Sequence, residues 1–177
     1  MRPVPKPPVG QPDDSEGVSP ELATLLKQQL TLTGQILYRK LAGRGRLAEY
    51  ERMIGIDRAD VAFRKAVVLA LARYITGSWM EATTPPPPMR RPRGRPQLEF
   101  ARQSTLELAA AFEKVTGRPA TIDNRTDDGC GPFRDLLDLF QADYDRYVLH
   151  FVPDDAPTFA SDRLWRLYRE ARNGLTR

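Results

Sequence analysis

Six prolines between Pro85 and Pro96 divide the chain, and they constrain its fold more than any other feature of the sequence. Proline removes a backbone donor and fixes φ, so this stretch can neither continue a helix nor enter a central strand. The segment 83–96 also lacks the apolar residues that would compensate the entropy of ordering it. We therefore expect an extended linker here, with a folded region on either side.

Hydrophobic residues recur every three or four positions on both sides of the linker, which predicts amphipathic helices. Before the linker, the spacing predicts a long helix from Ser19 to about Gly43 and a short one over 46–54. A third helix is expected to be capped by Asp57, to bury Val61 and to end at Gly77. After the linker, we expect helices over about 98–116, 132–151 and 161–174.

No stretch of credible length shows the alternation of a β-strand. The predicted fold class is therefore all-α, in two small helical halves joined by a Pro/Arg-rich extended linker. The expected divisions are a disordered Pro-rich tail, a first helical region, the linker and a second helical region, at residues 1–18, 19–82, 83–96 and 97–177.

Charge is distributed unevenly along the chain, whose formal net charge is +4. The basic excess lies in residues 19–96, whereas residues 97–177 are net acidic. Such segregation is typical of a chain that contacts a polyanion with one part and something else with the other.

The linker carries four closely spaced arginines, Arg90, Arg91, Arg93 and Arg95, with Gly94 between the last two. The sequence Pro92-Arg93-Gly94-Arg95-Pro96 resembles the AT-hook, a short motif that binds the minor groove of A·T-rich DNA. The resemblance covers residues 90–96. It implies that Arg93 and Arg95 enter the groove, that Gly94 lets the backbone approach its floor, and that Arg90 and Arg91 contact phosphates.

A second region, Leu47 to Ala66, resembles the turn region of a helix-turn-helix DNA reader. The resemblance rests on Gly55-Ile56-Asp57 between two predicted helices, and it implies that Asp57 caps a recognition helix. Glu51 and Lys65 depart from the pattern of that family. Independently of this resemblance, we expect phosphate contacts from four nearby basic residues: Arg39, Lys40, Arg44 and Arg46.

The sequence offers little catalytic or metal-binding chemistry. Cys130 and His150 are the only residues of their kinds, so the chain alone cannot supply the ligands of a structural zinc site. Asp135, Asp138 and Asp143 are interpreted as the solvated face of an amphipathic helix rather than as a cation site. We expect no enzyme activity, no metal and no cofactor.

The longest apolar run is too short to cross a bilayer, and the N-terminus lacks the apolar core of a secretory signal. We expect a soluble, cytoplasmic protein without membrane contact. The C-terminal helices carry an aromatic stripe, interpreted as the core of the second half. The alternative is a surface for a homodimer or another protein partner, made by Phe133, Phe140, Tyr144, Tyr147, Phe151, Trp165 and Tyr168.

Two hypotheses for function follow. In the first, a small bacterial accessory or regulatory protein contacts A·T-rich DNA through its linker, weakly unless a second contact contributes. In the alternative, the chain is a helical protein–protein interaction or adaptor protein. Its linker then acts only as a solubilising spacer and has no role in binding nucleic acid.

Overall fold

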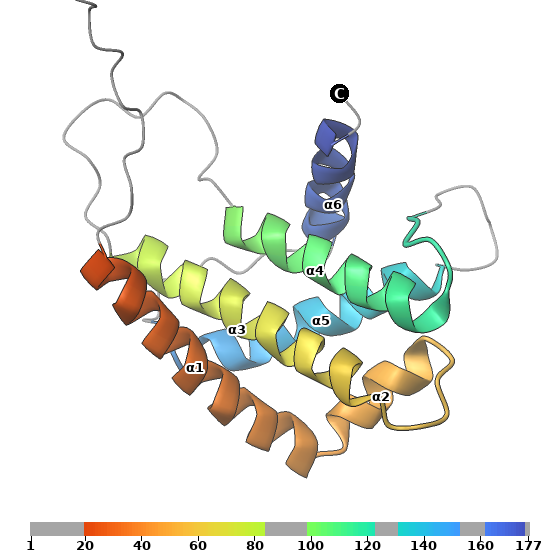
Figure 1. Ribbon diagram of the computed structural model, residues 1–177, viewed down its shortest axis with the longest axis horizontal. Coiled ribbons are helices and arrows are strands. Elements are labelled where there is room, and N and C mark those ends of the chain that lie inside the picture. Colours follow the sequence, from red (N-terminus) through yellow and green to blue (C-terminus); the bar gives the residue numbers. More distant parts are fainter. Residues whose placement is uncertain (1–19, 84–98, 123–130, 153–161, 176–177) are drawn as a thin grey trace, which may run out of the picture.

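The computed structural model describes residues 20–83, 99–122, 131–152 and 162–175. All regular structure within these ranges is helical, which confirms the all-α class (Figure 1). The helices are α1 (Pro20–Gly43), α2 (Arg46–Met53), α3 (Val61–Thr83), α4 (Glu99–Thr116), α5 (Pro132–Val148) and α6 (Asp162–Leu175). None of these described helices combines the length and apolar character needed to cross a membrane.

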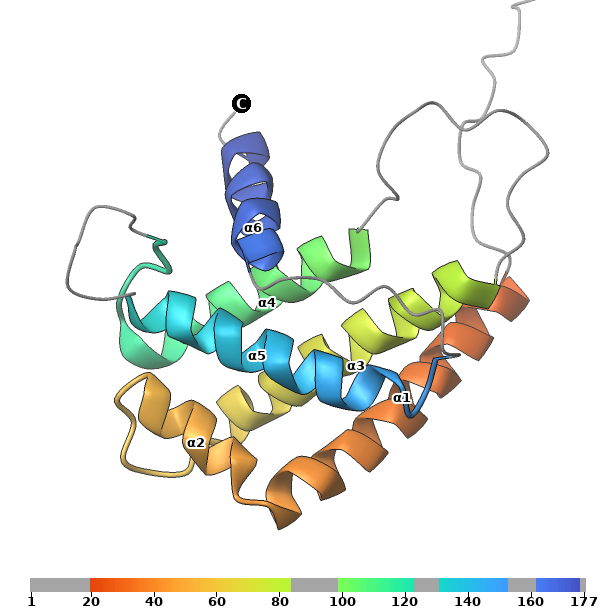
Figure 2. The ribbon, with the colours of Figure 1, turned by 180° about the vertical axis from the view of Figure 1, so that it is seen from behind.

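Helix α3 lies at the centre of the bundle, between α1 and α4 in Figure 1. Helix α5 crosses behind α3 in that view and comes to the front in Figure 2, while α6 packs on α4 and α5. A single hydrophobic core takes residues from all six helices, from Leu37 in α1 to Tyr168 in α6. The helical regions on the two sides of the linker therefore share one core.

Aromatic side chains join the two regions. Tyr74 of α3 stacks on Tyr144 of α5 with ring centroids 3.7 Å apart. The Tyr144 hydroxyl bonds Ser78 Oγ at 2.6 Å, so its polar end is satisfied inside the core. Phe133, Phe140 and the other rings of α5 are buried, as their interpretation as core residues predicted. These rings pack against the first helical region as well as the second.

The start of α3 differs from the prediction. The helix begins at Val61 and is capped by Asp60, whose carboxylate accepts a hydrogen bond of 2.8 Å from the Phe63 N–H. Asp57 is exposed and lies three residues earlier. Val61, expected in the core, is 80% exposed because it falls in the first turn, on the outer side of the helix.

The end of α3 differs as well, because Gly77 does not stop the helix. The helix continues to Thr83, and α4 passes so close that a Cβ on Gly77 would lie 2.3 Å from Phe100 Cβ. An ion pair between Arg73 and Glu107 lies further along the same contact. These two contacts show that α3 and α4 run antiparallel, and that Gly77 serves their close approach.

Other helix boundaries follow the predicted signals. Gly117 ends α4 with φ +66°, and its N–H donates to the Glu113 carbonyl at 2.9 Å. Pro132 occupies the first turn of α5, where the missing N–H costs nothing.

Candidate functional site

The arginine segment 90–96 lies outside the described residues, but the helices that flank it are described. Because α3 and α4 form an antiparallel hairpin, segment 84–98 leaves the bundle and returns to it at the same end. Neighbouring antiparallel helices are commonly joined by roughly 2–8 residues. The connection is therefore much longer than the packing of α3 on α4 requires, and its excess length carries the arginines.

The predicted phosphate contacts in α1 lie away from this hairpin end. Figure 1 shows α1 beginning beside the end of α3, so Arg39, Lys40 and Arg44 lie towards its far end. At 1.5 Å per residue, Lys40 is roughly 30 Å along the helix from Pro20. Arg39 and Arg44 are exposed and Lys40 is half-buried. The structure does not bring them close to the helix ends that flank the arginine segment.

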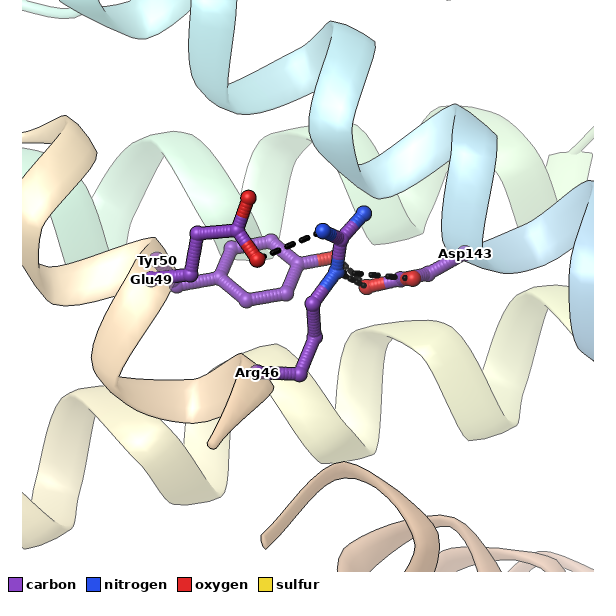
Figure 3. A network of polar contacts seen from close by, with 4 residues as sticks. All are labelled: Arg46, Glu49, Tyr50 and Asp143. Atoms are coloured by element: carbon purple, nitrogen blue, oxygen red, sulfur yellow. Dashed lines mark hydrogen bonds and ion pairs between the residues drawn. The ribbon is translucent and has the colours of Figure 1, made fainter. Parts of the chain in front are cut away.

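Arg46 is held by carboxylates of the bundle itself (Figure 3). Its Nε donates to both carboxylate oxygens of Asp143, at 3.0 and 3.1 Å, and its Nη1 donates to Glu49 at 2.6 Å. The Tyr50 hydroxyl donates to the same Asp143 carboxylate at 2.8 Å. This network joins α2 to α5, and it occupies the guanidinium that the sequence suggested for phosphate.

Asp143 is fully buried, so it does not belong to the solvated acidic face expected of α5. Burial raises the pKa of the Tyr50 hydroxyl well above its usual value, and the negative charge of Asp143 raises it further. Tyr50 therefore remains a protonated donor to Asp143 at any ordinary pH. Because its members bond one another and two of them are fully buried, we interpret the network as structural.

A second polar cluster fixes the connection between α2 and α3. Glu51 is buried, and its carboxylate accepts hydrogen bonds from Arg64 Nε at 2.7 Å and Nη2 at 2.8 Å. It also accepts the Asp60 N–H at 2.7 Å. The Arg64 hydrogen bonds lower the pKa of Glu51. Glu51, which departs from the helix-turn-helix pattern, is thus the residue that organises this connection.

The resulting geometry differs from a helix-turn-helix. Residues 54–60 separate α2 from α3, whereas the motif joins its helices by a turn of about three or four residues. Asp60 caps the second helix in place of Asp57. Lys65 is exposed on the surface of α3.

The surface feature that sequence reasoning missed is a groove of about 550 Å³ between α1 and α3. Leu30 and Gly34 of α1 and Val68 of α3 lie along it. Three further apolar residues that line it remain substantially exposed: Tyr38 (50%), Val61 (80%) and Leu69 (38%). The spacing of Val61 and Leu69 on one side of α3 was a usable signal, but Val61 was assigned to the core.

Metal-binding chemistry is lacking in the part of the chain that the structure describes. No three His, Cys, Asp or Glu residues gather there as a cation would require. His150, just beyond the end of α5, is exposed and contacts the ring of Tyr147. Cys130 falls outside the described ranges.

Comparisons of the chain with models of protein families, with curated proteins and with solved structures gave no match.

Proposed function

We propose that this chain is a DNA-binding accessory or regulatory protein that grips A·T-rich minor grooves through Arg93 and Arg95. Arg90 and Arg91 provide phosphate contacts beside the groove. In this proposal, the helical bundle is the scaffold from which the arginine segment projects.

The observation that carries this proposal is the antiparallel contact of α3 and α4, made by Gly77 against Phe100 and by Arg73 with Glu107. A spacer is useful between two bodies that must be kept apart, but both helical regions here share one core. Segment 84–98 is therefore a long connection within one body. Long connections on a rigid scaffold frequently carry binding residues, and this one carries four closely spaced arginines.

The structure narrows the set of supporting contacts. Arg46 bonds Asp143 and Glu49, so we leave it out of the DNA surface. Arg39, Lys40 and Arg44 lie too far along α1 to extend the contact made by the arginine segment. With four arginines engaged, the logarithm of the binding constant should fall with the logarithm of salt concentration with a slope of roughly −3 to −4.

Fluorescence anisotropy with a labelled A·T-rich duplex tests the proposal. We expect the double variant R93A/R95A to bind at least about tenfold more weakly than the wild type at low salt. The matched control R39A/R44A removes the same number of charges from the far part of α1 and should bind much like the wild type. Equal affinity of R93A/R95A and wild type, or absence of binding by both, would reject the proposal.

A second candidate function is that of a helical interaction or adaptor protein. The groove between α1 and α3 favours it, because apolar side chains there remain exposed although the chain has a well-formed core. The two functions are compatible, since the groove and the arginine segment involve different residues.

A further inference from the structure

The groove between α1 and α3 has the form of a helix-binding site. Its walls are two neighbouring helices, α1 from Leu30 to Arg39 and α3 from Val61 to Leu69. At 1.5 Å per residue these walls are each roughly 12–14 Å long, which matches about three turns of a helix laid between them. Its volume of about 550 Å³ lies in the range of real binding sites.

The floor of the groove is apolar and has little side-chain cover at its centre. Gly34 of α1 carries no side chain, and a Cβ placed on it would lie 3.9 Å from Ala72 Cβ of α3. The exposed side chains of Tyr38, Val61 and Leu69 lie around this shallow centre. Amphipathic helices bind such grooves with apolar residues spaced three and four apart.

The charges on the two walls have one sign. Between Thr24 and Gly43 in α1, and between Val61 and Trp79 in α3, every charged residue is basic. Arg64 and Arg73 are paired with Glu51 and Glu107. Among the described residues, by contrast, no carboxylate forms an ion pair with Arg39 or Lys65, which line the groove. The groove is therefore apolar at its floor and positively charged at its rim.

From this combination we infer that the α1–α3 groove binds an acidic amphipathic helix of a partner protein. The apolar face of that helix covers Tyr38, Val61 and Leu69, and its carboxylates meet Arg39 and Lys65. A second copy of this chain is a poorer occupant, because facing grooves would bring their basic rims together. The inference rests on the interaction role and is independent of DNA binding by the arginine segment.

The experiment uses the full chain and a fluorescein-labelled peptide of about three to four helical turns. Leucines stand at positions i, i+4, i+7 and i+11 of this peptide, and glutamates occupy its other faces. We expect saturable binding to the wild type that is weakened at least about tenfold in V61E/L69E. The matched control L32E/I36E adds the same charge at two exposed apolar residues of α1 that do not line the groove. It should bind like the wild type.

A charge-reversed rim provides a second variant that does not rely on apolar residues. R39E/K65E should lose the glutamate peptide and gain affinity for an otherwise identical lysine peptide. If V61E/L69E proved unfolded by circular dichroism, this pair of measurements would decide the question. A wild type that failed to bind the glutamate peptide, or V61E/L69E binding it as well as the wild type does, would overturn the inference.

The other occupants give distinct results. If light scattering found a wild-type dimer and a V61E/L69E monomer, the groove would be a self-association surface and the inference would be wrong. Loss of DNA binding by V61E/L69E together with no peptide binding by the wild type would identify a nucleic-acid surface and would also overturn it. Failure of the peptide alone would leave the R93A/R95A result, and so the proposed DNA contact, unaffected.

Discussion

Gly77 and Phe100 hold α3 and α4 at a distance that no other residue at position 77 allows. A Cβ on Gly77 would lie 2.3 Å from both Cβ and Cγ of Phe100, far inside van der Waals contact. The nearest atoms belong to the base of the ring, which a side-chain rotation cannot move far away. The helices themselves would have to separate, and the shared core would open with them.

Gly77→Ala should therefore destabilise the protein, although alanine is the better helix former. Helix propensity alone would favour alanine by about 1 kcal/mol, whereas overpacking costs typically about 1–3 kcal/mol and more where backbone must move. We expect a net loss of at least about 1 kcal/mol in the free energy of unfolding, measured by urea denaturation. Gly174→Ala in α6, where an added Cβ meets no atom within 4 Å, is the control and should be neutral or stabilising. A G77A variant as stable as the wild type would contradict the close contact.

The buried network between α2 and α5 gives a second prediction. Asp143→Asn removes the charge that Arg46 and Tyr50 share, and leaves a largely buried guanidinium without its main partner. We expect a loss of about 3 kcal/mol in urea denaturation. Asp145→Asn, two residues along the same helix, should cost much less, because burial already raises the pKa of the Asp145 carboxyl and disfavours its charge. Equal effects of the two substitutions would show that Arg46 does not depend on Asp143.

Glu51 should make the stability depend on pH in the acid range. The hydrogen bonds from Arg64 lower its folded-state pKa below the usual 4.5, so the ionised form stabilises the fold. This contribution is present above about pH 4.5 and is lost as the pH falls through the folded-state pKa. Glu51→Gln should therefore be less stable than the wild type at pH near 7, and the difference should shrink towards about pH 2. A difference that stayed constant over this range, in urea titrations at several pH values, would exclude the ionised pair as its cause.

The shared core predicts how the chain behaves when its linker is cut. A protease recognition site inserted between Pro86 and Pro87 allows cleavage between α3 and α4. Because the two regions bury aromatic side chains against each other, we expect the fragments to stay together in size-exclusion chromatography and to unfold in one transition. Fragments that separate without denaturant, or that unfold in two transitions, would indicate two independent domains.

Local signals predicted most of the helices but not how the two regions combine. Apolar spacing and the glycine and proline punctuation located α1, α2, α4 and α5 closely. The sequence around Gly77 looks like a helix end, and only the approach of Phe100 explains why a glycine lies inside α3. Asp57 and Asp60 are equally good capping residues in the sequence, and the buried carboxylate of Glu51 selects Asp60 by binding its N–H.

The candidate site was harder to predict for the same reason. Asp143 looks like part of a polar helix face until α2 places Arg46 and Tyr50 against it. The groove depends on how α1 and α3 pack, so the exposure of Tyr38 and Val61 cannot be read from either helix alone. The arginine segment is the opposite case, because its charge and proline content are properties of the sequence itself.

The central claim is that Arg93 and Arg95 read the minor groove of A·T-rich DNA from one end of a single helical bundle. Its most direct test is anisotropy titration of the wild type with two duplexes of equal length, one A·T-rich and one G·C-rich, at about 50 mM and about 200 mM salt. We predict tighter binding to the A·T-rich duplex at both salt concentrations, and loss of that preference in R93A/R95A. Equal binding to both duplexes by the wild type, or no binding to either at the lower salt concentration, would contradict the claim.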